Sequence, residues 1–168
     1  MRRALAAVLI ILLPPLVWWL FIRPIPVTVS VYFTRTVAGE NTLAAVTRTV
    51  RARSTESRLR GAYRALLAGP TAEERAAGYS TEIPAETRLR AVVAGAGVAA
   101  VDLTAAIEAG GGSSSMQARV WQIVYTGTQF PSARAVRILI EGQARQALGG
   151  EGVIIDAPIP RPERTPTF

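Results

Sequence analysis

Carboxylates and hydroxyls are the side chains that could do chemistry in this chain, because histidine and cysteine are both absent. A Cys/His metal site, a cysteine nucleophile and a histidine-based triad therefore cannot be built. The best acid–base pair is Asp102 with Glu108 or Glu82, since glycosidases act with two carboxylates at a defined separation. Asp102 follows a predicted strand, where we expect it to cap the next turn, and Ser113 to Ser115 have no base beside them. We therefore expect no enzymatic activity, no cofactor and no metal.

Residues 4–22 form an unbroken uncharged segment between Arg3 and Arg23. At about 1.5 Å per residue, a helix over this segment covers the roughly 30 Å hydrocarbon core of a bilayer. Trp18 and Trp19 lie near its end, where indole rings favour the membrane interface. The sequence predicts a transmembrane anchor at residues 1–23, a single domain at residues 24–155 and a tail at residues 156–168.

The charges around the predicted span indicate its orientation. Arg2, Arg3 and the amino terminus precede the span and only Arg23 directly follows it. The positive-inside bias then leaves the N-terminus in the cytoplasm and the domain on the extracytoplasmic side of the cytoplasmic membrane. A cleaved signal peptide is the alternative, although Leu20 to Pro24 offers bulky residues where a signal peptidase needs small ones.

The net charge of +7 comes entirely from arginine, because the chain contains no lysine. The arginines are spread along the sequence, whereas nucleic-acid binding needs a clustered basic face, usually with aromatic stacking partners. The charge favours anionic lipid head groups or acidic wall polymers as partners, and not nucleic acid.

The first half of the domain begins as a β-hairpin. Val27 to Thr34 alternates apolar and polar residues, a turn occupies residues 38–41, and Leu43 to Val50 can return as the second strand. Ser54 is a predicted helix N-cap, and apolar residues follow at helical spacing as far as Leu67.

The next residues predict the end of this helix and the start of a second one. Gly69 and Pro70 end the helix, and Thr71 with Glu74 forms a capping box for a short second helix that ends near Gly78. Pro84 then forces the residue before it toward an extended conformation.

The second half again has two strands followed by a helix, and it ends with one more strand. Alternating residues predict strands at Leu89–Val93 and Val98–Leu103, and residues 110–115 are predicted to be a flexible connection. A helix is predicted from Met116 to Thr126 and a strand from Val136 to Ile140. This order predicts an α+β fold, a two-layer sandwich of a mostly antiparallel sheet with helices on one face.

The C-terminal segment is rich in proline. Val153 to Ile155 has the composition of a short edge strand, and four prolines follow from Asp156 onward. The sequence therefore predicts an extended, largely disordered tail, in which Arg161 and Arg164 could touch an acidic partner and for which a solvated tail without a role is the alternative.

Several short motifs occur in an order that resembles the sporulation and spore germination (GerMN) domain family. The resemblance covers roughly residues 27–142, and the Leu-Leu-x-Gly-Pro-Thr element with the downstream Ile-Pro is its most specific part. The motifs are Val31-Tyr32-Phe33, Leu66 to Thr71 with Glu74 and Gly78, Ile83-Pro84, Val101-Asp102-Leu103 and Gln122 to Thr126.

The resemblance implies a non-catalytic module on the outer face of a cytoplasmic membrane. Members of the family occur in envelope lipoproteins and in a protein needed to assemble a transenvelope channel during endospore formation, and the fold is similar to ring-building domains of secretion systems. This chain has one copy of the domain where the sporulation protein has two. It also has a predicted spanning helix where the lipoproteins carry a lipidated cysteine.

The motif residues that the resemblance singles out also have a structural explanation as caps, turns and core. We expect this role for Gly69, Pro70, Thr71, Glu74, Gly78, Pro84, Asp102, Tyr125 and Thr126. The sequence identifies no binding face. The expected partners are the cytoplasmic membrane and an envelope protein, with a wall polymer as the alternative and self-association left open.

Overall fold

The structure is a computed structural model that describes residues 13, 19, 23–37, 39–149 and 153–168. Apart from Leu13 and Trp19, the predicted membrane span therefore lies outside the described residues. In the described part of the chain, none of the helices combines the length and the apolar character that crossing a bilayer requires.

A long antiparallel hairpin opens the domain, as the alternation of apolar residues predicts. Val31 faces Val46 in its register, and the buried residues Val29, Val31 and Phe33 form the row that faces the core. A third short strand pairs with the other side of the first one, with Thr34 opposite Ser80. The strands of this sheet are β1 (Ile25–Val37), β2 (Glu40–Ala52) and β3 (Tyr79–Ser80), in the order β2-β1-β3.

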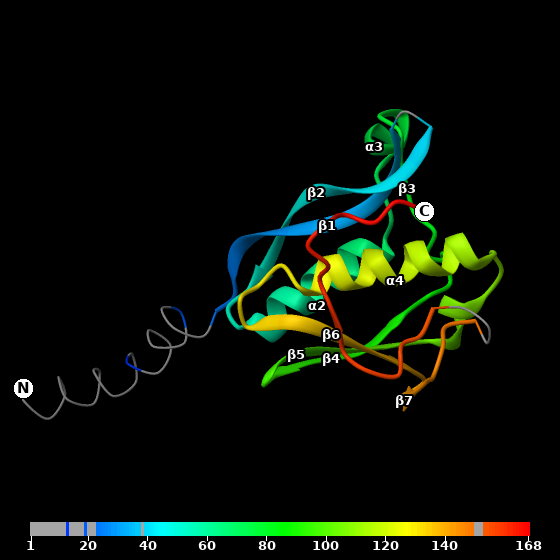
Figure 1. The fold of residues 1–168 in the computed structure, drawn as a ribbon. Coiled ribbons are helices and arrows are strands. Elements are labelled where there is room, and N and C mark those ends of the chain that lie inside the picture. Colours follow the sequence, from blue (N-terminus) through cyan, green and yellow to red (C-terminus); the bar gives the residue numbers. More distant parts are fainter. Residues whose placement is uncertain (1–12, 14–18, 20–22, 38, 150–152) are drawn as a thin grey trace, which may run out of the picture.

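A separate five-stranded sheet forms the opposite side of the domain (Figure 1). Its first two strands make the predicted second hairpin, while the next strand runs parallel to its neighbour, with Val101 opposite Ile138. The strands are β4 (Leu89–Gly95), β5 (Gly97–Leu103), β6 (Ala133–Ile140), β7 (Gln143–Ala144) and β8 (Ile159–Pro160), of which β8 pairs with β6.

Two helices, α2 (Thr55–Leu67) and α4 (Ser113–Gly127), lie between the two sheets (Figure 1). The α2 helix contacts β1 and β2 on one side and β4 on the other, and α4 contacts β1 and β6. The hydroxyl of Tyr63 in α2 donates a hydrogen bond to the carbonyl of Ile123 in α4 over 3.2 Å. The core is therefore a helical layer covered by a sheet on each side.

The predicted two-layer sandwich with helices on one face of one sheet is wrong, although the α+β class is correct. The reason lies in α4, whose buried residues include Arg119, Gln122 and Thr126 as well as its apolar ones. A helix that is buried on nearly all sides needs cover from more than one layer. The parallel pairing of β5 and β6 also makes the second sheet mixed, because a helical crossover joins these two strands.

The shorter helices follow from their caps, with one difference from the prediction. The α3 helix (Ala72–Ala76) has the predicted capping box, and a 3₁₀ helix, η2 (Ala105–Glu108), follows β5. Residues 113–115, predicted as part of a flexible connection, instead form the first turn of α4. Ser115 explains the earlier start, because its hydroxyl donates to a carboxylate oxygen of Glu82 over 2.7 Å.

The C-terminal segment also differs from its prediction, because residues 156–168 lie against the domain. After β8 pairs with β6, Thr167 forms an isolated bridge with Thr42, and the Phe168 amide donates to the carbonyl of Asn41 over 3.1 Å. Ile154 likewise makes one isolated bridge, with Ala147, in place of an edge strand. The prolines keep the tail extended as expected, and its order comes from distant contacts that local composition does not encode.

Candidate functional site

Asp102, the first member of the candidate carboxylate pair, lies in a structural network. One of its carboxylate oxygens accepts from the Gly142 amide over 2.8 Å, and the other accepts from Arg90 Nε over 3.0 Å. The predicted cap on the following turn comes instead from Glu141, which accepts from the Ala105 amide over 3.0 Å. Asp102 therefore fixes the loop after β6 to the end of β5.

The two alternative partners of Asp102 hold other segments in place. Glu82 accepts from the Ser115 hydroxyl, as described above, and Glu108 accepts from the Gly149 amide over 3.2 Å. Within the residues that the structure describes, no group of three or more acidic side chains is arranged to hold a metal ion. The absence of enzymatic activity stays a prediction.

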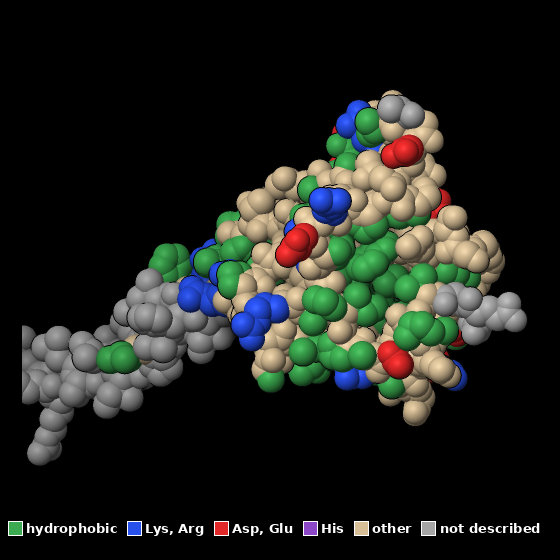
Figure 2. Space-filling view, viewed as in Figure 1, with side chains coloured by type: hydrophobic (Ala, Val, Ile, Leu, Met, Phe, Trp, Pro, Cys, Tyr) green, Lys and Arg blue, Asp and Glu red, His purple; other side chains and the backbone are tan. Residues whose placement is uncertain are grey.

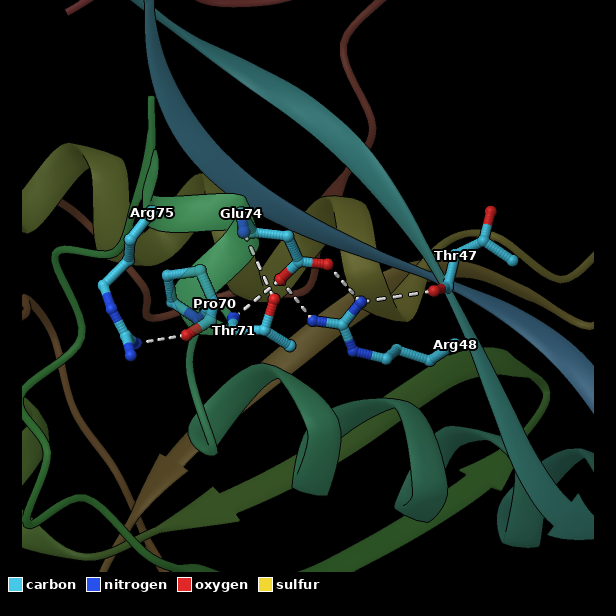
Figure 3. Close-up of polar contacts among 6 residues, drawn as sticks. All are labelled: Thr47, Arg48, Pro70, Thr71, Glu74 and Arg75. Carbon is cyan, nitrogen blue, oxygen red and sulfur yellow. Dashed lines mark hydrogen bonds and ion pairs between the residues drawn. The ribbon is translucent and has the colours of Figure 1, made fainter. Parts of the chain in front are cut away.

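The motif residues Thr71 and Glu74 form the centre of a polar cluster at the start of α3 (Figure 3). The Thr71 hydroxyl accepts from the Glu74 amide over 3.2 Å, and the Glu74 carboxylate accepts from the Thr71 amide over 2.8 Å. Arg48 on β2 donates two hydrogen bonds of 2.6 Å to the two oxygens of the same carboxylate. Glu74 therefore caps its own helix and fastens that helix to the first sheet.

The ion pair changes the acidity of both partners in the expected directions. Its hydrogen bonds with Arg48 lower the pKa of Glu74 below its ordinary value of 4.5, with smaller help from the Thr71 amide. The same hydrogen bonds raise the pKa of the Arg48 guanidinium, against the cost of its partial burial. Both side chains keep some solvent contact, at 21% and 17% exposure, so water weakens the pair without removing it.

The remaining motif residues shape the chain on either side of α3. Gly69 and Gly78 adopt positive φ values of 76° and 86°, which only glycine reaches without strain, so each can end the helix before it. The Pro70 carbonyl accepts a hydrogen bond from Arg75, and the Pro84 carbonyl accepts from the Thr87 amide over 3.0 Å. In the structure these residues lie at helix ends and in turns.

The same motif also lines an open groove of about 420 Å³. Leu67, Gly69 and Pro70 from the end of α2 form one part of its wall, and Ile83 forms another. A second cavity of about 290 Å³ shares Leu67 and Ala68 with the groove and extends to Leu89 at the start of β4. We call these two cavities together the motif groove. It is the candidate binding site, and it brings together residues from the two most specific parts of the motif.

The last two motif residues, Tyr125 and Thr126, lie on α4 and join it to β1. The Thr126 hydroxyl accepts from the Tyr32 amide over 3.2 Å, and the rings of Tyr32 and Tyr125 meet edge to face at 5.3 Å. The guanidinium of Arg161 lies 4.5 Å from the Tyr125 ring centroid and 5.1 Å from that of Tyr32. The tail is therefore clamped on this aromatic pair.

Sequence reasoning missed Arg48 and the clamp made by Arg161. Arg48 occupies an ordinary position of a predicted strand, and its partner Glu74 lies 26 residues further along the chain. Arg161 reaches Tyr32 across 129 residues. No local sequence pattern predicts such pairs, because each pair depends on how the two sheets and the tail are placed in space.

Comparison with known proteins identifies the class of α+β domain to which the chain belongs. The family model of Germane, described as sporulation and spore germination, matches residues 30–146, which is most of the chain. The chain therefore belongs to this family, as the motif resemblance predicts. A comparison with curated proteins finds no match.

Solved structures share the fold. The first GerMN domain of the sporulation protein GerM from Bacillus subtilis is 23% identical, with a TM-score of 0.60, over 80% of this chain and 98% of that one. A "putative lipoprotein" from Clostridium perfringens is 23% identical, with a TM-score of 0.59, over 81% and 88% of the two chains. The tandem GerMN domains of GerM are 18% identical, with a TM-score of 0.62, and this chain, covering 83% of its own length, spans 47% of theirs.

Proposed function

We propose that the protein is a non-catalytic interaction module that is anchored in the cytoplasmic membrane and scaffolds or modulates an assembly of the cell envelope. Its domain lies on the extracytoplasmic side in this proposal. The uncharged segment at residues 4–22 and its flanking arginines support the anchor and its orientation. Membership of the sporulation and spore germination family supports a role in that process or in a related envelope assembly.

The motif groove is the observation that carries the proposal. Its larger cavity is open to solvent and lined by apolar residues such as Leu67, Pro70 and Ile83, with Tyr79 and Arg75 beside them. Grooves of this kind accept apolar side chains of a partner, while a few polar groups fix the partner's orientation. The second cavity leads from the groove to the strand β4. The partner that suits both features is an extended protein segment.

The β4 strand adds a backbone surface to the groove. It lies at one edge of the five-stranded sheet, and no other strand of the described residues pairs with its outer side. Val93 on this strand is 60% exposed. An extended partner segment could fill the motif groove with side chains and continue as an added strand along β4.

A wall polymer, either peptidoglycan or an anionic polymer, is the second candidate partner. Exposed arginines such as Arg51 and Arg134 support this alternative, because they can attract anionic groups. Binding of that kind should weaken strongly as salt is added, since surface charges are screened. Contact through an apolar groove should depend on salt much less.

Crosslinking of the full-length protein in intact cells tests the proposal. We expect a defined envelope protein to be recovered with it from purified membranes, and a version without residues 1–23 to be lost from the membrane fraction. Recovery of wall fragments alone, released by high salt, would contradict the scaffold proposal and support binding to a wall polymer. Recovery of cytoplasmic proteins alone would contradict the proposed orientation.

A further inference from the structure

Arginines that are far apart in the sequence meet at one end of the domain. The Nε of Arg53 donates to the carbonyl of Arg23 over 2.6 Å, and Arg51 lies opposite Pro26 in the hairpin register. Arg134 lies at the start of β6, at the same end. Figure 2 shows arginine side chains gathered where the described part of the N-terminal chain enters the domain. We call Arg23, Arg51, Arg53 and Arg134 the basal arginines.

The first turn of α2 joins the two sheets at this end. The hydroxyls of Thr55 and Ser132 lie 3.1 Å apart, which brings the end of the first hairpin next to the start of β6. Between them lies an open cavity of about 500 Å³, lined by Arg134 together with the turn between β4 and β5. Arg53, two residues before Thr55, and Arg134, two residues after Ser132, are therefore brought to the same end of the domain.

Two of the basal arginines, Arg51 and Arg134, take no part in the ion pairs of the described residues. Arg51 and Arg134 are exposed, and the ion pairs of the described residues use Arg48, Arg60 and Arg90 instead. Glu56 at the start of α2 is already paired with Arg60 over 2.7 Å. Exposed arginines such as Arg51 and Arg134 attract polyanions.

Acidic residues gather instead at the opposite end of the second sheet. Asp102, near the end of β5, and Glu141, directly after β6, both pair with Arg90. Glu108 follows in η2 and accepts from the loop after β7. The domain therefore has a basic end and a more acidic end, and an anionic surface would orient it with the basic end facing that surface.

Exposed apolar side chains accompany the basal arginines. Ile25 is 42% exposed and Trp19 is 54% exposed, and the guanidinium of Arg23 lies 5.2 Å from the Trp19 ring centroid. Arginine and tryptophan together suit the head-group region of a bilayer, where an apolar ring and a charged tip are both accommodated. In the sequence, the uncharged residues 4–22 directly precede this end.

We propose that the basal arginines bind the anionic head groups of a lipid bilayer and hold this end of the domain against the membrane surface. This inference rests on the proposed function, because it assumes that residues 4–22 keep the domain beside a membrane. It goes further in naming the surface that faces the lipid and the chemistry of the lipid. It also leaves the motif groove, at the other end of α2, free for a protein partner.

Hydrogen exchange of the full chain in lipid nanodiscs tests the inference. One preparation contains phosphatidylcholine alone and the other contains phosphatidylcholine with phosphatidylglycerol. We expect residues 51–55 and 131–134 to exchange more slowly in the anionic discs, and high salt to abolish this protection. Nanodiscs expose both leaflets, so the result does not depend on the side of the membrane that the domain faces in cells.

Two charge variants separate lipid binding from a general effect of net charge. The double variant R51Q/R134Q should lose the protection, while R35Q/R145Q, which removes two exposed arginines away from the basic end, should keep it. Both variants should unfold at temperatures close to that of the parent, because the four side chains are exposed.

Equal exchange of the basal segments in both kinds of disc would overturn the inference. Protection by a soluble polyphosphate polymer but not by anionic lipid would also overturn it and would identify a wall polymer as the ligand. A chain that fails to enter phosphatidylcholine discs would instead contradict the anchor of the proposed function. In that case, lipid binding is measured by flotation of the same chain with anionic vesicles and with neutral vesicles. Equal flotation with both kinds of vesicle would contradict the inference.

Discussion

At the scale of single residues, Glu74 links a local cap to a long-range ion pair. Its carboxylate accepts from the Thr71 amide and from both guanidinium nitrogens of Arg48 that face it. The cap follows from two residues three positions apart, so the sequence alone predicts it. The contact with Arg48 requires β2 and α3 to be placed side by side, and only the structure reveals it.

Replacing Glu74 by Gln should lower the free energy of unfolding by about 1 kcal/mol near neutral pH, because the pair is charge-assisted but partly solvated. The pKa of Glu74 is lowered in the folded protein, so its contribution is fully present above the ordinary value of 4.5 and disappears as the pH falls through the lower folded value. Chemical denaturation across this range measures the effect.

The matched control for this prediction is Glu73→Gln, which removes the same charge from an exposed position of the same helix. Its stability should stay close to that of the parent. If E74Q and E73Q have the same stability at every pH, the ion pair with Arg48 contributes nothing to folding.

Gly127, near the end of α4, illustrates close packing between the helices and the second sheet. A methyl group at this position would collide with the Tyr63 hydroxyl and with a methyl group of Val136. We expect Gly127→Ala to destabilise the domain by about 3 kcal/mol, because the neighbours are buried and have little room to move. Thermal unfolding measures this loss.

Gly95→Ala provides the comparison, since nothing lies within 4 Å of the added methyl group. It should change stability by less than about 0.5 kcal/mol. Equal melting temperatures of the two alanine variants would show that α4 is not packed against α2 and β6 in the way described.

At the scale of elements, local patterns predict the pieces and their ends. The alternation around Val29, Val31 and Phe33 predicts β1, and Ser54 and Thr71 cap the helices that they are expected to cap. The start of α4 is missed because residues 110–115 are glycine and serine, which local composition assigns to a loop. A side-chain contact from Ser115 to Glu82 favours the helical turn there.

The tail is the element whose order depends most on one side chain. Arg161 contacts the rings of Tyr32 and Tyr125 and donates to the carbonyl of Tyr125 over 2.5 Å and to the Thr128 hydroxyl over 3.0 Å. We expect Arg161→Ala to release residues 156–168, which should then exchange amide hydrogens faster, and to lower stability by about 1–2 kcal/mol.

Arg164→Ala is the control for the tail, because the contact of Arg164 with Tyr125 uses its backbone carbonyl and its side chain is exposed. Exchange in the tail should then match the parent. Unchanged exchange in the R161A variant would mean that the clamp on the tyrosines does not hold the tail.

At the scale of the whole molecule, the sequence predicts the α+β class and the family but not the arrangement of the layers. The apolar stripe of α2 is compatible with one sheet, and nothing in the spacing of Val92, Val101 or Ile138 says that these residues belong to a second sheet. The gathering of Arg23, Arg51 and Arg134 at one end is hidden for the same reason, since these residues are far apart along the chain.

The arrangement separates the two surfaces that we propose for different partners. The basal arginines lie at the start of α2, and the motif groove begins at its end, with Leu67 and Ala68 in the wall. A domain oriented with its basic end toward a bilayer would therefore present the groove away from the lipid. This separation would let membrane contact and protein contact occur together.

Site-specific photocrosslinking in cells of the native host tests whether the motif groove binds an envelope protein. A photoreactive residue is placed at Ala68 or Ala85 in the motif groove, or at Ala144 on β7 as the control, since all three positions are exposed. We predict that both groove positions crosslink to the same envelope protein and that Ala144 does not. Equal labelling from all three positions, or labelling of wall fragments alone, would contradict it.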